Sequence, residues 1–497
     1  MSCSMPRAFS FGRRLLGPVI LSLIVLKQVG AIPCQESHAA AALLPSTCKV
    51  EGKAILVYAR LNHMFSEART CVVCPPPFTM DSASGRLPLE VHEYILDHLW
   101  DDHSTLAVCS LTCRVWLPTT RFHLFRRVSL ASYVEYTRFE RLLDECPGIA
   151  HHVRTLLICN AHHVVPMNRD FTRILLRLQN VEYLTLNCWR AYQMSNETRK
   201  NLQVCFPAVK TIVLEDSHFC DHDFPGIILA CPRLTAIHLI GITSSSSSSP
   251  PIWPLELVPA GSSPESQVDT LVWSFSSNDT LVWLLNGPSM LRLRELQLSF
   301  FHSDIHPEVE NLAQQLLHAA GASLQRLSLG ISPTFGTPNV SHDTLHLSRN
   351  PNLEWLQLKG IILDGDRAIH FSSILCSIVS QIQPCHTKLR QIQAELIVAR
   401  ISDIAALRFE QFDETLAALL QDRQSLEVLF HVCNATLHSR GHDFQAWARE
   451  VSDVISTGLP RVRTRLLVEC ADAGFPHAGW GGPTKSRQQV VYRYSEK

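Results

Sequence analysis

Apolar residues recur in one short pattern over most of the chain, at the first, fourth and sixth positions of a six-residue unit. Clear copies begin at Val153, Val181, Val209, Leu234, Leu293, Leu324 and Leu353, and weaker ones begin at Val268, Leu389 and Leu426. The shortest interval between neighbouring copies is 25 residues, from Val209 to Leu234, and the longest is 37, from Leu389 to Leu426. A recurring unit of this length predicts a repeat architecture.

Each unit combines a short strand with a helical stretch. Alternation along the strand turns the fourth and sixth residues inward. Helices are predicted between the strands, over Phe171–Leu178, Glu197–Val204, Pro307–Ala319, Ala368–Ile382, Glu414–Leu420 and Phe444–Ile455. One such unit cannot bury its apolar face alone, whereas stacked copies share a continuous core. The pattern therefore predicts an α/β solenoid over residues 131–470. A non-repetitive domain with alternating helices and strands is the alternative.

Polar residues between the inward ones should line an open face of the predicted sheet. Examples are Glu182 and Thr185, Glu295 and Gln297, Arg326 and Ser328, and Glu354 and Gln357. Their mixed charge suits a protein partner better than a phosphate backbone. Two interruptions are expected to be flexible, the Ser/Pro-rich loop at 243–266 and the tail at 471–497. For the tail, capping the array is the alternative.

A different pattern occupies residues 80–130, where three short helices are predicted. Pro88 suits the start of the first helix, which Asp101-Asp102 should end. Ser104 can cap the second helix. A third helix is expected from Cys113 to about Leu117, before Pro118 interrupts it. So short a segment buries little surface alone, so some of its apolar side chains should face a partner or the next domain.

This segment resembles an F-box over residues 86–127, in the form found in mushroom-forming fungi. The matching positions are Leu87-Pro88, Glu90, Ile95-Leu96, Leu99, Asp101-Asp102, Leu106 and Cys113-Arg114-Val115-Trp116. The resemblance implies docking to a Skp-type adaptor and, through it, to a cullin scaffold. It implies adaptor contacts by Leu87, Pro88, Ile95, Leu96 and Leu106, and a small core held together by Leu99, Leu111 and Trp116.

An F-box followed by an irregular leucine-rich-repeat array resembles the substrate receptors of cullin-based (SCF-type) ubiquitin ligases. In that class the repeats capture the protein to be ubiquitinated. No HExxH, GxSxG, P-loop or GxGxxG motif appears, so we expect a non-catalytic adaptor without a cofactor. Such a chain would work in the cytoplasm or nucleus.

The leader at 1–79 supports another hypothesis. Arg7, Arg13 and Arg14 precede an apolar run from Leu15 to Leu26, and small residues follow at Val29-Gly30-Ala31. This is typical of a secretory signal peptide. It favours a secreted or surface leucine-rich-repeat recognition protein, with sequons at Asn196, Asn278, Asn339 and Asn434. Translation from Met80 is the alternative.

Composition narrows these choices. The chain has 44 Lys and Arg against 45 Asp and Glu, a net charge of −1, so it has no global attraction to nucleic acid. A mean hydropathy of +0.06 with one long apolar run excludes a polytopic membrane protein. The 17 cysteines are scattered and odd in number, which indicates reduced, buried thiols.

Possible metal ligands gather at three places, none of which predicts a site. Cys71 and Cys74 form a lone CxxC without further ligands. Cys109 and Cys113, near His103, lie in the helical segment and suit packing. A third group comprises His218, Cys220, Asp221, His222 and Asp223, where a polar loop after a strand is expected anyway.

Overall fold

The computed structural model describes one part of the chain in detail. The described residues are 88–112, 114–159, 169–190, 206–220, 223–245, 267–274, 276–286, 290–300, 307–331, 345–363, 367–435, 443–471 and 489–494. The chain divides into two units, Met1–Pro77 and Phe78–Lys497, and all described residues belong to the second. The predicted leader at 1–79 and the residues of its signal-like pattern lie outside them.

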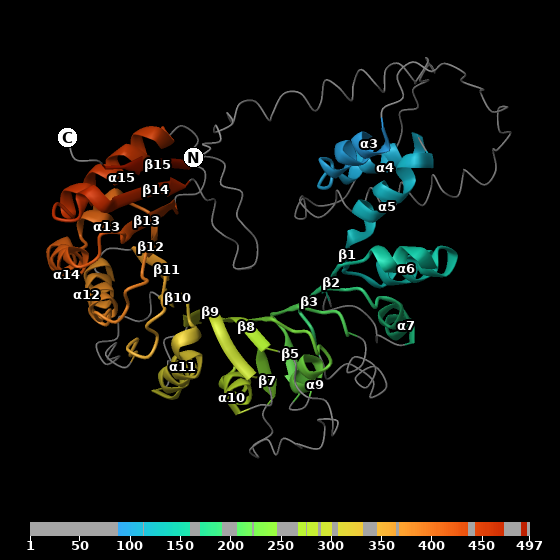
Figure 1. Ribbon diagram of the computed structural model, residues 1–497, viewed down its shortest axis with the longest axis horizontal. Helices are drawn as coiled ribbons and strands as arrows, with labels where there is room; N and C mark the ends of the chain where they lie inside the picture. The colour runs from blue at the N-terminus through green and yellow to red at the C-terminus, as the bar shows by residue number, and fades with distance from the viewer. Residues whose placement is uncertain are drawn as a thin grey trace, which may run out of the picture. The chain divides into compact units, whose positions relative to one another are not determined.

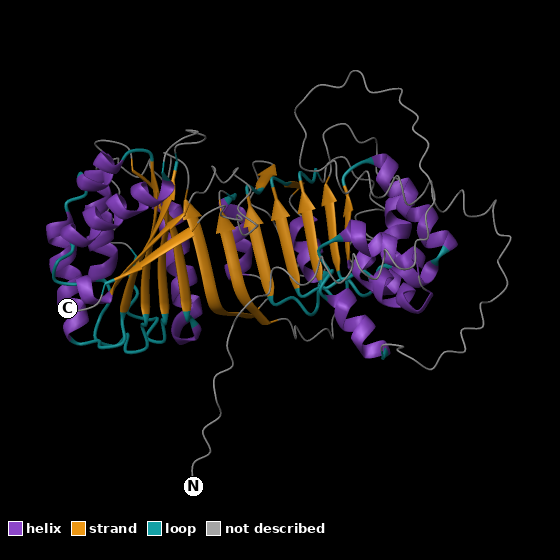
Figure 2. Ribbon diagram, turned by 90° about the horizontal axis from the view of Figure 1, so that it is seen from above, coloured by secondary structure: helices purple, strands orange, loops and turns teal. Residues whose placement is uncertain are grey.

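One long sheet runs through the described residues (Figures 1 and 2). Thirteen strands follow one another in the order β1-β2-β3-β4-β6-β8-β9-β10-β11-β12-β13-β14-β15. Neighbours pair in parallel from β1 to β14, and β15 pairs antiparallel with β14. The strands are β1 Arg127–Leu130, β2 Thr155–Cys159, β3 Tyr183–Asn187, β4 Thr211–Glu215, β6 Ala236–Ile240, β8 Gln267–Ser274, β9 Met290–Phe300, β10 Arg326–Ile331, β11 Trp355–Leu363, β12 Gln391–Val398, β13 Glu427–Asn434, β14 Leu466–Ala471 and β15 Gln489–Arg493.

Helices lie along one side of this sheet (Figure 1). They are α6 Tyr133–Glu145, α7 Arg169–Arg177, α9 Asp223–Leu229, α10 Asn278–Asn286, α11 Pro307–Ala320, α12 Arg367–Ser380, α13 Ile401–Ala405, α14 Phe409–Gln421 and α15 Phe444–Gly458. Five of them, α7, α11, α12, α14 and α15, overlap predicted helices. The sequence pattern missed α6, α9, α10 and α13, and the helix expected over Glu197–Val204 lies outside the described residues.

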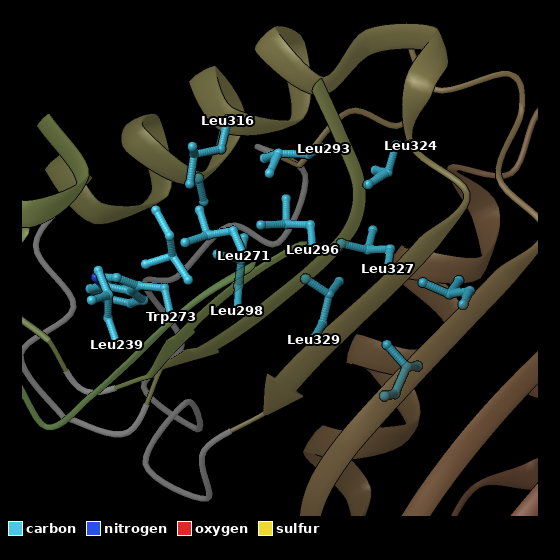
Figure 3. Packing of buried hydrophobic residues seen from close by; sticks show 14 of the residues in the cluster. Leu239, Leu271, Trp273, Leu293, Leu296, Leu298, Leu316, Leu324, Leu327 and Leu329 are labelled. Atoms are coloured by element: carbon cyan, nitrogen blue, oxygen red, sulfur yellow. The ribbon is translucent and has the colours of Figure 1, made fainter. Parts of the chain in front are cut away.

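The core forms where equivalent strand residues stack in register. Leu271, Leu296, Leu327 and Leu356 are consecutive partners across four strands, and each is fully buried. The next inward row contains Trp273, Leu298, Leu329 and Leu358, and helix residues such as Leu316 close over it (Figure 3). Burying one such side chain contributes about 1.5–3 kcal/mol. The predicted α/β solenoid is confirmed.

The periodic pattern was wrong at one rung. The unit at Leu426 was expected to turn Leu429 and His431 inward. Instead Val428 and Phe430 pair with the inward residues of β12 and are buried. Leu426 itself is buried as expected, but it stands two residues before Val428 rather than three. A strand turns alternate side chains to one face. Because one residue fewer separates Leu426 from the first inward residue of β13, the residues of this strand face the opposite way from the prediction.

The array also begins and ends elsewhere than predicted. Strand β1 lies within the range assigned to the helical segment, and it pairs Val128 and Leu130 with the inward residues of β2. Strand β14 adds Leu466 and Val468 as a further rung. The expectation of a flexible tail at 471–497 is wrong for β15, which pairs with β14 at the end of the sheet. The flexible loop expected at 243–266 is likewise wrong for its first three residues, which form strand β7 (Thr243–Ser245).

The helical segment precedes the sheet and consists of α3 Leu89–Asp97, α4 His103–Thr112, the short 3₁₀ turn η1 Arg114–Trp116 and α5 Leu117–Arg126. Pro88 precedes α3, as expected. Asp102, rather than Ser104, caps α4, because its carboxylate accepts hydrogen bonds from the Thr105 amide at 3.0 Å and the Ser104 hydroxyl at 2.7 Å. Pro118 lies in the first turn of α5, where proline fits. The predicted interruption there is wrong.

Candidate docking surfaces

The helical segment has a small core of its own. Leu96, Leu106, Cys109 and Leu124 are buried together, and Leu99, Trp116 and Phe125 pack against them. The His123 ring lies 2.8 Å from the Asp97 carboxylate and joins α5 to α3. Phe125 also packs against the main core of the sheet, so one side chain is shared by both clusters.

The residues singled out in this segment fall into three groups. Pro88 is exposed and Ile95 half-buried, while Leu87 lies outside the described residues. Leu96 is 2% exposed and Leu106 is fully buried, so the expectation that they contact an adaptor directly is wrong. Leu111 is 49% exposed, so its assignment to the core is also wrong. One helix cannot turn both Leu106 and Leu111 into so small a core, because at 3.6 residues per turn a separation of five residues places them on nearly opposite sides of the helix.

Large apolar side chains are concentrated on the outside of this segment. Among the described residues, thirteen large hydrophobic residues are exposed, and seven of them lie between Pro88 and Trp116. Their exposure ranges from 38% to 63%, and they are Leu89, Val91, Tyr94, Trp100, Val108, Leu111 and Val115. Single exposed apolar residues need no explanation, but a gathering of them marks a contact surface. The spacing of Val108 and Leu111, three residues apart on α4, was the sequence signal that could have identified part of it.

The sheet presents a second surface, the polar face opposite the helices. Thr185, Gln297, Ser328 and Gln357 occupy one row of this face, with Val213, His238 and Val272 between the first two. Ser328 donates a hydrogen bond to Gln357 at 3.3 Å. Glu295 and Arg326 are partners in the row beside it, as expected for polar residues between inward ones.

Burial governs titration on the polar face. Burial lowers the pKa of His238 below its ordinary 6.5. The pKa of Lys359 on β11 is also lowered by burial, against the opposing effect of Glu395 and Glu295. Burial and then the neighbouring Asp216 raise the pKa of Glu215 at the end of β4. Charge on this face is therefore partly dehydrated, which strengthens its interactions with a bound partner.

The cysteines with described surroundings are free thiols. Five of them are buried: Cys109, Cys231, Cys376, Cys433 and Cys470. Burial raises the pKa of Cys231, Cys433 and Cys470 to about 12. A protonated thiol is neither a nucleophile nor a metal ligand, so these side chains serve packing.

The three candidate metal groups assemble no site within the described part of the chain. No cluster of three or more His, Cys, Asp or Glu side chains is placed there to hold an ion. Cys109 belongs to the small helical core. His218 and Cys220 lie on β5 (His218–Cys220), which pairs with β7 (Thr243–Ser245), and Asp223 begins α9. Cys71, Cys74, Cys113, Asp221 and His222 lie outside the described residues.

Two further features bear on location. No helix in the described ranges is both long and apolar enough to cross a bilayer. Of the four sequons, Asn278 and Asn434 are half-buried, the first at the start of α10 and the second at the end of β13. Both are therefore poorly placed to carry a glycan. Asn196 and Asn339 lie outside the described residues.

Comparison with known proteins identifies no family. No protein-family description matches the chain, and no curated protein is significantly similar to it. Among solved structures, a chain of the yeast Rad7–Elc1 complex matches with a TM-score of 0.35 and 13% identity, covering 87% of this chain and 96% of its own. The leucine-rich repeat-containing protein LegL7 from Legionella pneumophila matches with a TM-score of 0.33 and 12% identity, covering 68% and 94%.

Proposed function

We propose that this chain is a substrate receptor of a cullin-based ubiquitin ligase. In this role the helical segment is an F-box that docks to a Skp-type adaptor, and the polar face of the sheet holds the target protein. The observation that supports this most is the group of seven exposed apolar side chains between Pro88 and Trp116. It coincides with the part of the chain that resembles an F-box.

The energetics favour a partner for this surface. The helical segment has four buried residues in its own core, so it draws little stability from itself. Fully covering one exposed valine or leucine contributes about 1.5–3 kcal/mol. The same contact would therefore both stabilise the helical segment and hold the adaptor. We expect Leu89, Tyr94, Trp100, Val108 and Leu111 to supply the contacts that Leu96 and Leu106 cannot.

The proposed mechanism is bivalent. The receptor holds the adaptor at one end and the target on the sheet, which raises the local concentration of target lysines near a ubiquitin-loaded enzyme. The chemistry belongs to that enzyme, and this chain contributes position. Helix α5 ends at Arg126 and β1 begins at the next residue. Together with Phe125, which contacts both cores, this direct junction supports a fixed spacing between the two partners. The role places the chain in the cytoplasm or nucleus.

A binding experiment with matched variants tests the adaptor contact. The full chain is captured on immobilised recombinant Skp-type adaptor, comparing wild type with the Val108→Asp/Leu111→Asp variant. The control is Val134→Asp on α6, because Val134 is 53% exposed and Val108 is 54% exposed. We expect at least a tenfold loss of affinity in the double variant, because a charge desolvated at the contact costs several kcal/mol, and no change in the control.

Thermal unfolding of all three proteins separates lost contact from lost structure. Equal capture of wild type and the double variant, or no capture of either, contradicts the proposal. Leu87→Ala/Pro88→Ala provides an independent second variant at the start of the segment, and we expect it to weaken capture as well.

A further inference from the structure

One residue at or just before the beginning of each strand belongs to an edge row of the sheet; Asp269 and Arg294 are the members that lie inside their strands, β8 and β9. At the first rungs, each amide of the row donates a hydrogen bond to the preceding carbonyl: Arg154 to Arg126 at 2.9 Å, Glu182 to Arg154 at 2.8 Å and Lys210 to Glu182 at 2.8 Å. The row continues through Thr235, Asp269, Arg294, Gln325, Glu354 and Arg390. Residues about 28 positions apart in the sequence are thus stacked directly on one another.

The charges along this row are unevenly distributed. Its first four members, Arg126, Arg154, Glu182 and Lys210, include three cations and one anion. Farther along, opposite charges balance, as where Arg294 lies 3.9 Å from Asp269. The excess positive charge is therefore confined to the first rungs of the sheet.

Two more arginines and two histidines surround these first rungs. Arg127 begins β1 and is exposed, and Arg121 lies on α5, while the imidazoles of His151 and His152 belong to the 3₁₀ turn η2 (Pro147–His152) before β2. The ring of Phe122 lies 6.2 Å from that of His152, so α5 and η2 are in contact. We call these residues the entrance patch: Arg121, Arg126, Arg127, His151, His152, Arg154 and Lys210, with Glu182 as its acidic member.

The electrostatic potential of the patch affects the pKa of one acidic and one basic side chain. The pKa of Glu182 is lowered, first by its hydrogen bond from Lys210 and then by the charges of Lys210, Arg154 and Arg126. The pKa of His152 is lowered first by burial and then by the charges of His151, Arg121 and Arg154. The neighbouring cations therefore favour the anion at Glu182, and at His152 they add to the larger effect of burial.

Much of this charge lacks a counterion. Glu182 accepts a hydrogen bond from Lys210 at 3.1 Å and lies 4.0 Å from Arg154. Within the described residues, Arg121, Arg126 and Arg127 have no carboxylate within the 4.0 Å limit for an ion pair. Arg126 lies over the ring of Phe122 at 5.7 Å, which holds its guanidinium near the junction. These arginines are available to a partner.

We propose that the entrance patch binds an acidic segment of a partner protein, a run of Asp and Glu side chains in extended conformation. Arg126 and Arg127 are exposed and Arg121 is half-buried, and none of them has a counterion among the described residues. They provide the charge complementarity, which governs the association rate and selects the partner. The next row offers Thr155, Tyr183 and Thr211 as hydrogen-bonding neighbours. Glu182 at the centre, a single aromatic residue among these and a net charge of −1 all disfavour a continuous phosphate backbone. The proposal deepens the proposed function by naming the class of target, and it does not depend on the adaptor contact.

The test measures fluorescence anisotropy of a labelled ten-residue Asp/Glu peptide with the full chain at low salt. Wild type is compared with Arg126→Gln/Arg127→Gln. The matched control is Arg292→Gln/Arg294→Gln, which removes two positive charges from exposed arginines at the start of another strand, β9. Exposed charge pairs contribute about 0.3–1 kcal/mol each, so we expect the first variant to bind roughly three- to thirtyfold more weakly and the control to match wild type. Added salt should weaken wild-type binding.

Three results of the binding measurements overturn the proposal. They are no binding of the acidic peptide above that of a Lys-containing control peptide, equal losses in both variants, and tighter binding of a single-stranded oligonucleotide than of the acidic peptide. Capture of the Arg126→Gln/Arg127→Gln variant on the adaptor is measured in parallel. Retained capture with lost peptide binding assigns the patch to the target. Lost capture with retained peptide binding contradicts it.

Discussion

The ammonium group of Lys359 on β11 donates a hydrogen bond to the side-chain oxygen of Gln297 on β9, at 3.1 Å, although β10 lies between these strands. Gly330 occupies the intervening position on β10, paired with Ser299 on one side and Lys359 on the other. Because glycine has no side chain, the lysine can lie across this strand. The absence of one Cβ thus brings together two polar residues 62 positions apart in the sequence.

The first prediction concerns Gly330. A Cβ added there would meet the Oγ, Cβ and Cα atoms of Ser299 at 2.6, 2.7 and 2.9 Å. Since the Cα atom belongs to the backbone, β9 and β10 must move apart. Gly330→Ala should lower the free energy of unfolding by about 1–3 kcal/mol, measured as the urea midpoint. Gly148→Ala is the control, because no atom lies within 4 Å of its added Cβ. Equal midpoints for the two variants would show that the strands accommodate the methyl group.

Buried side chains also join successive repeats. Asn350 donates hydrogen bonds to the carbonyls of Leu317 at 2.9 Å and Gly321 at 3.0 Å in the preceding repeat. One repeat later His386 lies 2.9 Å from the carbonyl of Leu347, and Arg423 in the next donates to the carbonyl of Gln383 at 2.6 Å. The Asn350 and His386 bonds satisfy the carbonyls of Leu317 and Leu347 in the interior, whereas the Arg423 bond lies at the exposed surface.

The second prediction follows from that arrangement. Asn350→Ala removes the buried hydrogen bond to the Leu317 carbonyl and a second bond to the Gly321 carbonyl, which keeps the Leu324 amide as a donor. It should therefore cost about 1–3 kcal/mol of unfolding free energy. Asn352→Ala removes a bond to the carbonyl of Ala322 at the exposed surface, where water can replace it, and should cost under about 1 kcal/mol. Chemical denaturation of both variants provides the comparison. A larger loss for the Asn352 variant would refute this account of the links between repeats.

The third prediction concerns pH and His238 on the polar face. Burial lowers its folded-state pKa below the ordinary 6.5, so the unfolded chain binds more protons at this site. Stability from the neutral ring is complete above pH 6.5 and is lost as pH falls through 6.5 and the lower folded-state pKa. Between pH 7.5 and 5, wild type should therefore lose more stability than His238→Gln. Thermal melting across that range measures the difference, and parallel curves would count against it.

Much of the solenoid followed from the sequence. The spacing of Leu293, Leu296 and Leu298 is repeated at Leu324 and Leu353. To interpret it, one needs to assume only that a strand turns alternate residues to one face. Spacing of this kind can be recognised in the sequence without knowing which strands will pair with each other. The same reasoning failed at β13, where Leu426 and Val428 stand one residue closer, because a shift of one position exchanges the two faces.

The docking surfaces depended much more on the tertiary structure. The helical segment and its resemblance to an F-box could be identified from the sequence. The sequence could not show that Leu106 is buried while Leu111 is exposed. That choice depends on how α4 packs against α5 and α3. The added strand β15 likewise needed its partner β14 to be recognised.

The sequence by itself determined a repeating strand-and-helix chain with a buried leucine ladder, because burial and strand alternation act over a few residues. Only the tertiary structure decided which side chains gather on the surface. Stacking placed Arg126, Arg154 and Lys210 along one edge and left Glu182 as the acid among them. The reason is physical, since the field at a surface sums over charges close in space, whatever their separation along the chain.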